Sequence, residues 1–175
     1  PNTYRIFVLG GSAAMGVPSP DFSFSRFLEV MLKRAYPDQK FEVVNTALTA
    51  INSHVVRDIA SECAEYDPDL FIVYLGNNEV VGPFGPASVF EALADNLWAI
   101  RASLWLKGTR LGQSAGELAD TPTEAGDWEG MQMFLNNRVA SDDGRLERVY
   151  RQFAANLTAI CRAGERVAAK VLLCS

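Results

Sequence analysis

Apolar runs alternate with amphipathic stretches along the chain. Four short apolar runs predict buried strands at residues 4–9, 41–44, 70–75 and 167–174. Between them, apolar residues recur at helical spacing and predict helices over about 20–36, 53–66, 86–104 and 146–160. Near-continuous apolar strands that alternate with helices are typical of a parallel sheet covered on both faces. We therefore predict a single α/β domain over residues 1–175, a three-layer α/β/α flavodoxin-like fold.

Three segments of this pattern carry more specific predictions. The first helix should have Ser19 as its cap and Pro20 as its first residue. Residues 107–143 lose the regular spacing, which predicts an irregular insertion or lid. The last strand is as apolar as a central strand, and apolar sheet edges are normally covered. We expect missing chain or another subunit to cover it, so the domain is predicted to be incomplete at its C-terminus. The inner face of the first helix should consist of Phe24, Phe27, Leu28, Met31 and Ala35.

Composition narrows the classes of function. The 175 residues are 49% hydrophobic and 21% charged, which is typical of a chain with a real core. A net charge of −5 without a basic run argues against nucleic acid as a partner. Three cysteines lie far apart without metal-ligand spacing, which favours buried thiols and predicts neither metal nor disulfide. No apolar stretch is long enough to span a membrane, and the compartment stays open.

Small residues follow the first predicted strand, in the segment 10–16. In a parallel sheet, ligands bind at the carboxyl ends of the strands. As a phosphate loop this segment fails, because Val17-Pro18 replaces the required Lys-Ser/Thr. As a dinucleotide fingerprint it is a near match, but the acidic residue expected at the end of the second strand is missing. Two interpretations remain: a turn that exposes Ser12 as a nucleophile, or a glycine turn with an incidental serine.

Amide and small residues also follow the next two strands. Residues 45–50 (NTALTA) place alanines where backbone approaches the cleft, and residues 76–79 (GNNE) place Asn78 where its amide can donate into the cleft. Each loop alone is a weak signal, whereas their joint placement after three successive strands is hard to assign to chance.

In this order, Gly11-Ser12, Asn45-x-Ala47-x-x-Ala50 and Gly76-x-Asn78 resemble the first three sequence blocks of SGNH (GDSL-like) serine hydrolases. The resemblance covers about residues 4–86. It implies an esterase or acylhydrolase that works through an acyl-enzyme on Ser12, without metal or cofactor. The Ser12 N–H, the Ala47 N–H and the Asn78 amide would then stabilise the oxyanion. Gly11 and Phe84 would contact a small-molecule or carbohydrate ester, and the Trp105–Phe134 region is a second candidate for the pocket wall.

The sequence also departs from the family pattern. Gly11 replaces the usual aspartate, and Ala47 and Ala50 replace glycines, which suits a backbone donor only at negative φ. Glu79 replaces an aspartate and is interpreted as an ordinary acidic residue at the start of a helix or loop.

The family's base lies in an Asp-x-x-His segment near the C-terminus. The one histidine here, His54, is in the wrong place in the order and is interpreted as a surface or half-buried helical residue. We therefore expect the base beyond Ser175, and weak activity or none from these residues alone. The resemblance favours an extracytoplasmic location. Two alternatives remain open: an acyltransferase that passes the acyl group to a sugar hydroxyl, and a non-catalytic binding or scaffold domain.

Overall fold

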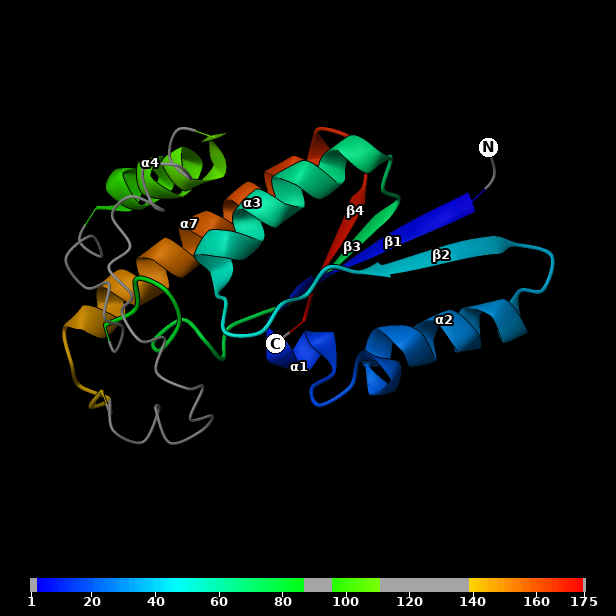
Figure 1. The fold of residues 1–175 in the computed structure, drawn as a ribbon, viewed down its shortest axis with the longest axis horizontal. Helices are drawn as coiled ribbons and strands as arrows, with labels where there is room; N and C mark the ends of the chain where they lie inside the picture. Colours follow the sequence, from blue (N-terminus) through cyan, green and yellow to red (C-terminus); the bar gives the residue numbers. More distant parts are fainter. Residues whose placement is uncertain (1–2, 87–95, 111–138, 175) are drawn as a thin grey trace. The chain divides into compact units, whose positions relative to one another are not determined.

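A computed structural model of the chain describes residues 3–86, 96–110 and 139–174. Strands and helices alternate along the chain (Figure 1). The chain divides into two compact units, Pro1–Glu79 with Arg151–Ser175, and Val80–Tyr150. The strands are β1 (Thr3–Gly10), β2 (Lys40–Asn45), β3 (Leu70–Tyr74) and β4 (Lys170–Cys174). The helices are α1 (Ser12–Met15), η1 (Pro20–Phe22), α2 (Phe24–Ala35), α3 (Ser53–Cys63), η2 (Ala64–Tyr66), α4 (Leu97–Gly108) and α7 (Arg145–Glu165).

The described strands form one parallel sheet in the order β2-β1-β3-β4. This arrangement confirms the predicted α/β fold class. The chain steps from β1 to β2 on one side and then crosses back to place β3 on the other side of β1. The switch point therefore lies between the carboxyl ends of β1 and β3, where Gly10 pairs with Tyr74. Ligand sites in open α/β sheets lie at such a point.

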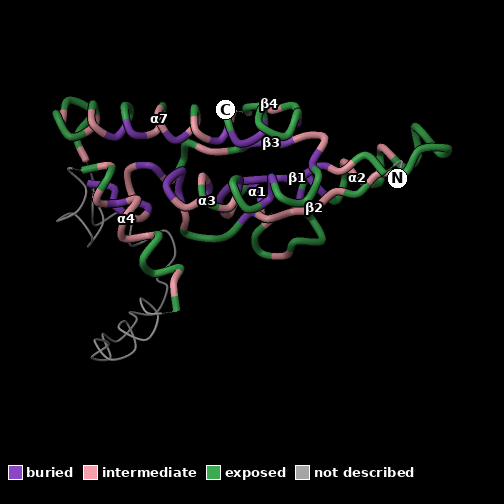
Figure 2. The backbone as a smooth tube through the Cα atoms, turned by 90° about the horizontal axis from the view of Figure 1, so that it is seen from above, coloured by how far each residue is buried: buried purple, intermediate pink, exposed green. Residues whose placement is uncertain are grey.

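Helices cover both faces of the sheet (Figure 1). Alternate residues of β1 point to opposite sides, so that Phe7 and Leu9 join the core cluster under α3 and α7. Ile6 and Val8 join the cluster under α1 and α2. This burial on both faces explains why the sequences of the central strands are continuously apolar. Figure 2 shows that most residues of β1 and β3 are buried.

The first helix differs from its prediction in two ways. Ser19 and Pro20 begin the short 3-10 turn η1, and Ser23 caps α2 by accepting a hydrogen bond from the Arg26 N–H. The predicted inner face is also wrong in part, because Phe27 and Met31 are 59% and 67% exposed. The side of α2 that meets the sheet carries Leu28 and Leu32, together with the buried residue Ser25. The helix therefore packs on a different stripe from the one that its aromatic residues suggested.

Only the later part of the third predicted helix falls on described residues. Within the described residues, α4 starts at Leu97, and Asn96 caps it from an extended conformation. The predicted start at Pro86 and Ser88 runs into residues 87–95, which lie outside the described residues. Most of the insertion predicted at 107–143 likewise lies outside them, so that prediction stays open. The last strand begins at Lys170 instead of Val167.

β4 forms one edge of the described sheet. Its Leu172 and Leu173 side chains are both about half exposed. The apolar edge expected from the sequence is therefore present on the described part of the chain, and what covers it stays a prediction.

Candidate functional site

The Ser12 turn lies directly at the end of β1. Gly10 permits it, because a Cβ there would lie 2.5 Å from the Tyr74 carbonyl oxygen and 2.6 Å from the Ala14 Cβ. Ser12 is the first residue of α1, so its N–H has no acceptor within the helix. The side chain is half-buried, and its hydroxyl has no hydrogen-bond partner among the described residues. A serine hydroxyl without a hydrogen bond to any described residue thus lies at the switch point of the sheet.

The Asn78 amide lies beside this turn. Its nitrogen is 3.0 Å from the point where a Cβ on Gly11 would stand, and it donates a 2.9 Å hydrogen bond to the Ile51 carbonyl oxygen. Asn78 is half-buried, not turned into the core. The structure therefore brings together the loops after β1, β2 and β3, as expected for residues at the carboxyl ends of neighbouring parallel strands.

Asn45 organises the loop after β2. Its amide nitrogen donates to the Ala14 carbonyl at 3.1 Å and to the Ser25 hydroxyl at 2.9 Å, so it ties this loop to α1 and α2. Its amide oxygen accepts from the Ala47 N–H at 3.1 Å. The N–H that was expected to face an oxyanion is thus engaged by Asn45, and the Ala47 side chain is buried in the core. In the sequence, Asn45 was noted as the first residue of Asn45-x-Ala47-x-x-Ala50, but its side chain was given no role.

Ala50 has the unusual backbone of this loop. Its φ is 58°, in the left-handed region that alanine rarely occupies, whereas Ala47 is not among the described residues with positive φ. No acceptor for the Ala50 N–H lies among the described residues. Residues held in such conformations tend to cluster at functional sites. The sequence signal for this position was its place as the second alanine of Asn45-x-Ala47-x-x-Ala50.

Glu79 and His54 are both buried, which corrects the expectation for His54. Glu79 accepts hydrogen bonds from Ser53, from its N–H at 2.9 Å and from its hydroxyl at 2.7 Å. It is therefore no ordinary surface carboxylate, and burial raises its pKa. His54 is neither a surface nor a half-buried residue, and its Nδ1 lies 3.0 Å from the Asn156 amide nitrogen. The Ser12 hydroxyl has no described partner, so His54 is not bonded to it.

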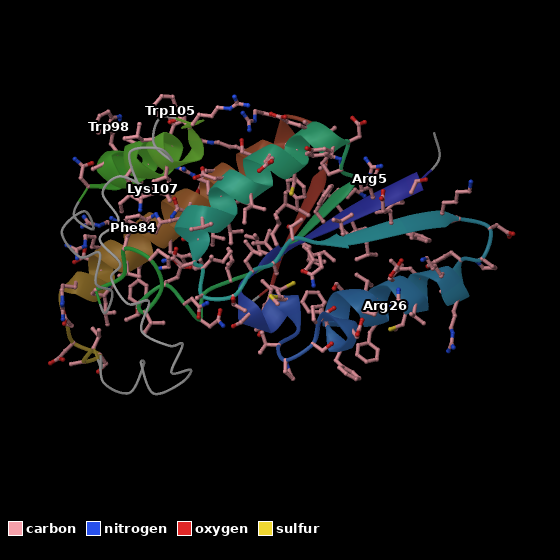
Figure 3. The ribbon with its side chains drawn as sticks, in the orientation of Figure 1. Arg5, Arg26, Phe84, Trp98, Trp105 and Lys107 are labelled. Atoms are coloured by element: carbon pink, nitrogen blue, oxygen red, sulfur yellow. The ribbon has the colours of Figure 1, made fainter. Side chains whose placement is uncertain are left out.

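The residues expected to wall the pocket belong to the second unit. Phe84 is buried there in a turn in which the Gly85 N–H donates to the Gly82 carbonyl, and its φ is 64°. Trp105 projects from α4 into solvent (Figure 3). Phe134 lies outside the described residues. The roles of Phe84 and of the Trp105–Phe134 region stay predictions.

Other features of the described chain lie apart from Ser12. A hollow of about 260 Å³ is lined by apolar side chains from β3, β4 and α7, and neither Ser12 nor Asn78 is among them. The described residues contain no cluster of acidic, histidine and cysteine side chains that could hold a metal ion. No helix in the described ranges has both the length and the apolar character to cross a bilayer.

This fold is the α/β fold of SGNH hydrolase structures. The structure of TesA superposes with a TM-score of 0.52 and 16% identity, over 97% of this chain and 58% of that one. The chain therefore spans little more than half the length of TesA. At this identity the similarity establishes the fold.

Two further solved structures are similar at lower TM-scores. AlinE4, described as an SGNH-hydrolase family esterase, has a TM-score of 0.42 and 15% identity over 98% of this chain and 76% of that one. An acetyl xylan esterase of Geobacillus stearothermophilus, Axe2-W215I, has a TM-score of 0.40 and 10% identity over 97% and 75%. No protein-family model matches the chain, and no curated protein matches it.

Proposed function

We propose that this chain carries the nucleophile and oxyanion donors of a serine ester hydrolase. The observation that carries the proposal is the approach of the Asn78 amide to the backbone of Gly11, next to a serine whose hydroxyl has no partner within the described part of the chain. A nucleophile and an amide donor then lie together at the switch point of the sheet.

The proposed reaction uses Ser12 as a covalent nucleophile. Its hydroxyl oxygen attacks the ester carbonyl carbon, a new C–O bond forms, and the hydroxyl proton passes to a base. The bond to the alcohol then breaks, and the alcohol leaves with a proton. Water hydrolyses the acyl-Ser12 ester and releases the acid. The negative charge on the carbonyl oxygen develops beside preorganised donors, which usually supply a large part of the rate.

Three groups are candidates for these donors. The resemblance implies the Ser12 N–H and the Asn78 amide, and the approach of this amide to Gly11 supports both. For the third, Ala47 would first have to release its 3.1 Å hydrogen bond to Asn45. The Ala50 N–H has no described acceptor, and the next residue, Ile51, holds the Asn78 amide. We therefore favour Ala50 over Ala47 as the third donor.

No described residue accepts a hydrogen bond from the Ser12 hydroxyl, so none of them is placed as the proton acceptor. The family resemblance assigns it to an Asp-x-x-His segment, which the 175 residues do not contain, and His54 is engaged with Asn156. An external base should therefore accelerate the reaction of Ser12. This expectation makes the proposal testable on the chain itself.

The test is covalent labelling by a fluorophosphonate with imidazole added as the external base. Intact mass and peptide mapping should show one adduct, on Ser12, which forms faster as imidazole increases. Ser12→Ala should abolish it, and Ser61→Ala, at an exposed serine of α3, should leave it unchanged. Loss of an oxyanion donor in Asn78→Ala should slow labelling by about a hundredfold. Labelling at another residue, or none at any imidazole concentration, would refute the proposal.

A further inference from the structure

A cluster of buried polar side chains lies beside the Asn78 loop, and we call it the polar cluster. Burying polar groups is unfavourable unless they are hydrogen-bonded, so such a cluster calls for an account of its bonds. Asn52, Ser53 and Asn156 are fully excluded from solvent, and the other two members are almost so. The members come from the start of α3, the loop after β3 and the middle of α7: Asn52, Ser53, His54, Glu79 and Asn156.

Ser53 is at the centre of the polar cluster. Both Glu79 oxygens accept from it, one from the N–H and one from the hydroxyl. The Asn156 amide nitrogen donates to the same hydroxyl at 3.0 Å and lies 3.0 Å from His54 Nδ1. The Ser53 N–H is one of the groups that a helix start leaves without an internal acceptor. Glu79 thus caps α3 from a position 26 residues away in the sequence.

The polar cluster continues directly into the candidate site. Asn78 precedes Glu79, and its amide donates to the carbonyl of Ile51, two residues before Ser53. Two adjacent residues of one loop are therefore joined to one short segment, 51–53, by three hydrogen bonds. The outer bond is the one from the Asn78 amide, which lies beside Gly11. The inner pair consists of the two bonds between Glu79 and Ser53, and both are buried. Because the inner pair is shielded from water, it fixes the position from which the outer bond is made.

We infer that Glu79 is a positioning residue, which holds the Asn78 amide in place by fastening its loop to Ser53. This inference rests on the proposed function, since it assigns a purpose to the Asn78 amide. Glu79 itself touches no reacting atom. Asn156 supports it from α7 by holding the Ser53 hydroxyl toward the carboxylate.

The test compares three variants at Glu79 and at a control position. Glu79→Ala removes both acceptors, whereas Glu79→Gln keeps an acceptor for the Ser53 N–H and fills the same space. Val56→Ala, on the same helix but in the apolar core, serves as the control for a general loss of stability. Each variant is checked for folding by circular dichroism and thermal unfolding before it is compared.

Two readouts separate positioning from a merely structural role. The first is the side-chain amide resonances of Asn78 in ¹⁵N-labelled protein, which should shift or broaden in Glu79→Ala and stay near the native values in Glu79→Gln and Val56→Ala. The second is the maximal rate of phosphonylation at Ser12 at saturating probe. It should fall by about tenfold to a hundredfold in Glu79→Ala and by less than about threefold in Glu79→Gln, because a misplaced donor loses much of its effect.

The outcomes discriminate between the two proposals. If Ser12 in the native chain is not labelled, the proposed function fails, while the Asn78 resonances still test the positioning. Unchanged resonances and rate in a folded Glu79→Ala would overturn the inference. So would an equal loss in Val56→Ala, or a Glu79→Gln variant as impaired as Glu79→Ala. Should Glu79→Ala not fold, Ser53→Ala takes its place, because it removes the hydroxyl bonds alone, with a shift of the Asn78 resonances expected.

Discussion

Substitution of Gly11 by alanine perturbs the candidate site without straining the backbone. Gly11 has φ −91° and ψ −159°, an extended conformation that alanine adopts freely. The added Cβ would lie 3.0 Å from the Asn78 amide nitrogen and 3.6 Å from the Ile51 carbonyl oxygen. The amide must therefore move by about 0.4 Å to reach an ordinary contact distance, which lengthens its 2.9 Å hydrogen bond toward the outer limit.

Two effects on stability then oppose each other. Weakening a neutral hydrogen bond removes up to about 1 kcal/mol from the free energy of unfolding. Replacing glycine by alanine at a compatible φ adds about 0.4–1 kcal/mol, because the unfolded chain has fewer conformations to lose. The free energy of unfolding should therefore change by less than about 0.5 kcal/mol in urea denaturation. Labelling of Ser12 should nevertheless slow by about tenfold or more, since the donor is displaced.

The assay measures unfolding and fluorophosphonate labelling on the same preparations. Gly108→Ala is the control glycine substitution, because no atom lies within 4 Å of its added Cβ. A double variant, Gly11→Ala with Asn78→Ala, should label no more slowly than Asn78→Ala alone, as expected for two residues that act through one contact. Labelling of Gly11→Ala at the native rate would refute the account of the site, because the amide would then be insensitive to its nearest neighbour.

The remaining predictions concern stability and are checked by urea unfolding. Burial raises the pKa of Glu79, so its contribution to stability is fully present below its ordinary pKa of 4.5 and is lost as pH rises through the raised value. The difference in the free energy of unfolding between the native protein and Glu79→Gln should therefore narrow as the pH rises above 4.5, and a constant difference would contradict this assignment. Ala50→Gly should raise the free energy of unfolding by about 0.5–1 kcal/mol, because relief of left-handed strain outweighs the entropy of glycine, and a loss of stability would show that φ is not strained. Phe71→Ala should lower the free energy of unfolding by about 3–5 kcal/mol, because Phe71 is fully buried. Phe27→Ala should lower it by less than about 1 kcal/mol, because Phe27 is exposed. Equal losses at both positions would restore the inner face first predicted for α2.

Much of the fold follows from the sequence, because burial on both faces leaves a direct mark. A strand inside a parallel sheet must be apolar at successive positions, so residues 70–74 could be assigned from their composition alone. The same pattern places the loops after three strands at one edge of the sheet. This is why the sequence alone predicts that Ser12 and Asn78 lie near each other.

The sequence did not decide which of several chemically similar residues, close together in the chain, makes a given contact. The first helix has apolar residues on more than one side, and periodicity does not say which side meets the sheet. The structure selects the side of Ser25, because Asn45 bonds its hydroxyl from the next strand. In the same way, Ala47 and Ala50 are alike in the sequence, but only one has its N–H engaged by Asn45.

Glu79 is the clearest case in which tertiary structure decided the role of a residue. By itself a glutamate after a strand indicates a solvated loop, since burying a carboxylate is unfavourable without partners. Its partner Ser53 is 26 residues away, and Asn156, which completes the set of bonds, is 103 residues from Ser53. The sequence by itself determined the sheet and the edge at which the chemistry gathers. Partners so distant are brought together only by packing of the whole sheet and its helices, so the polar cluster was decided by the tertiary structure.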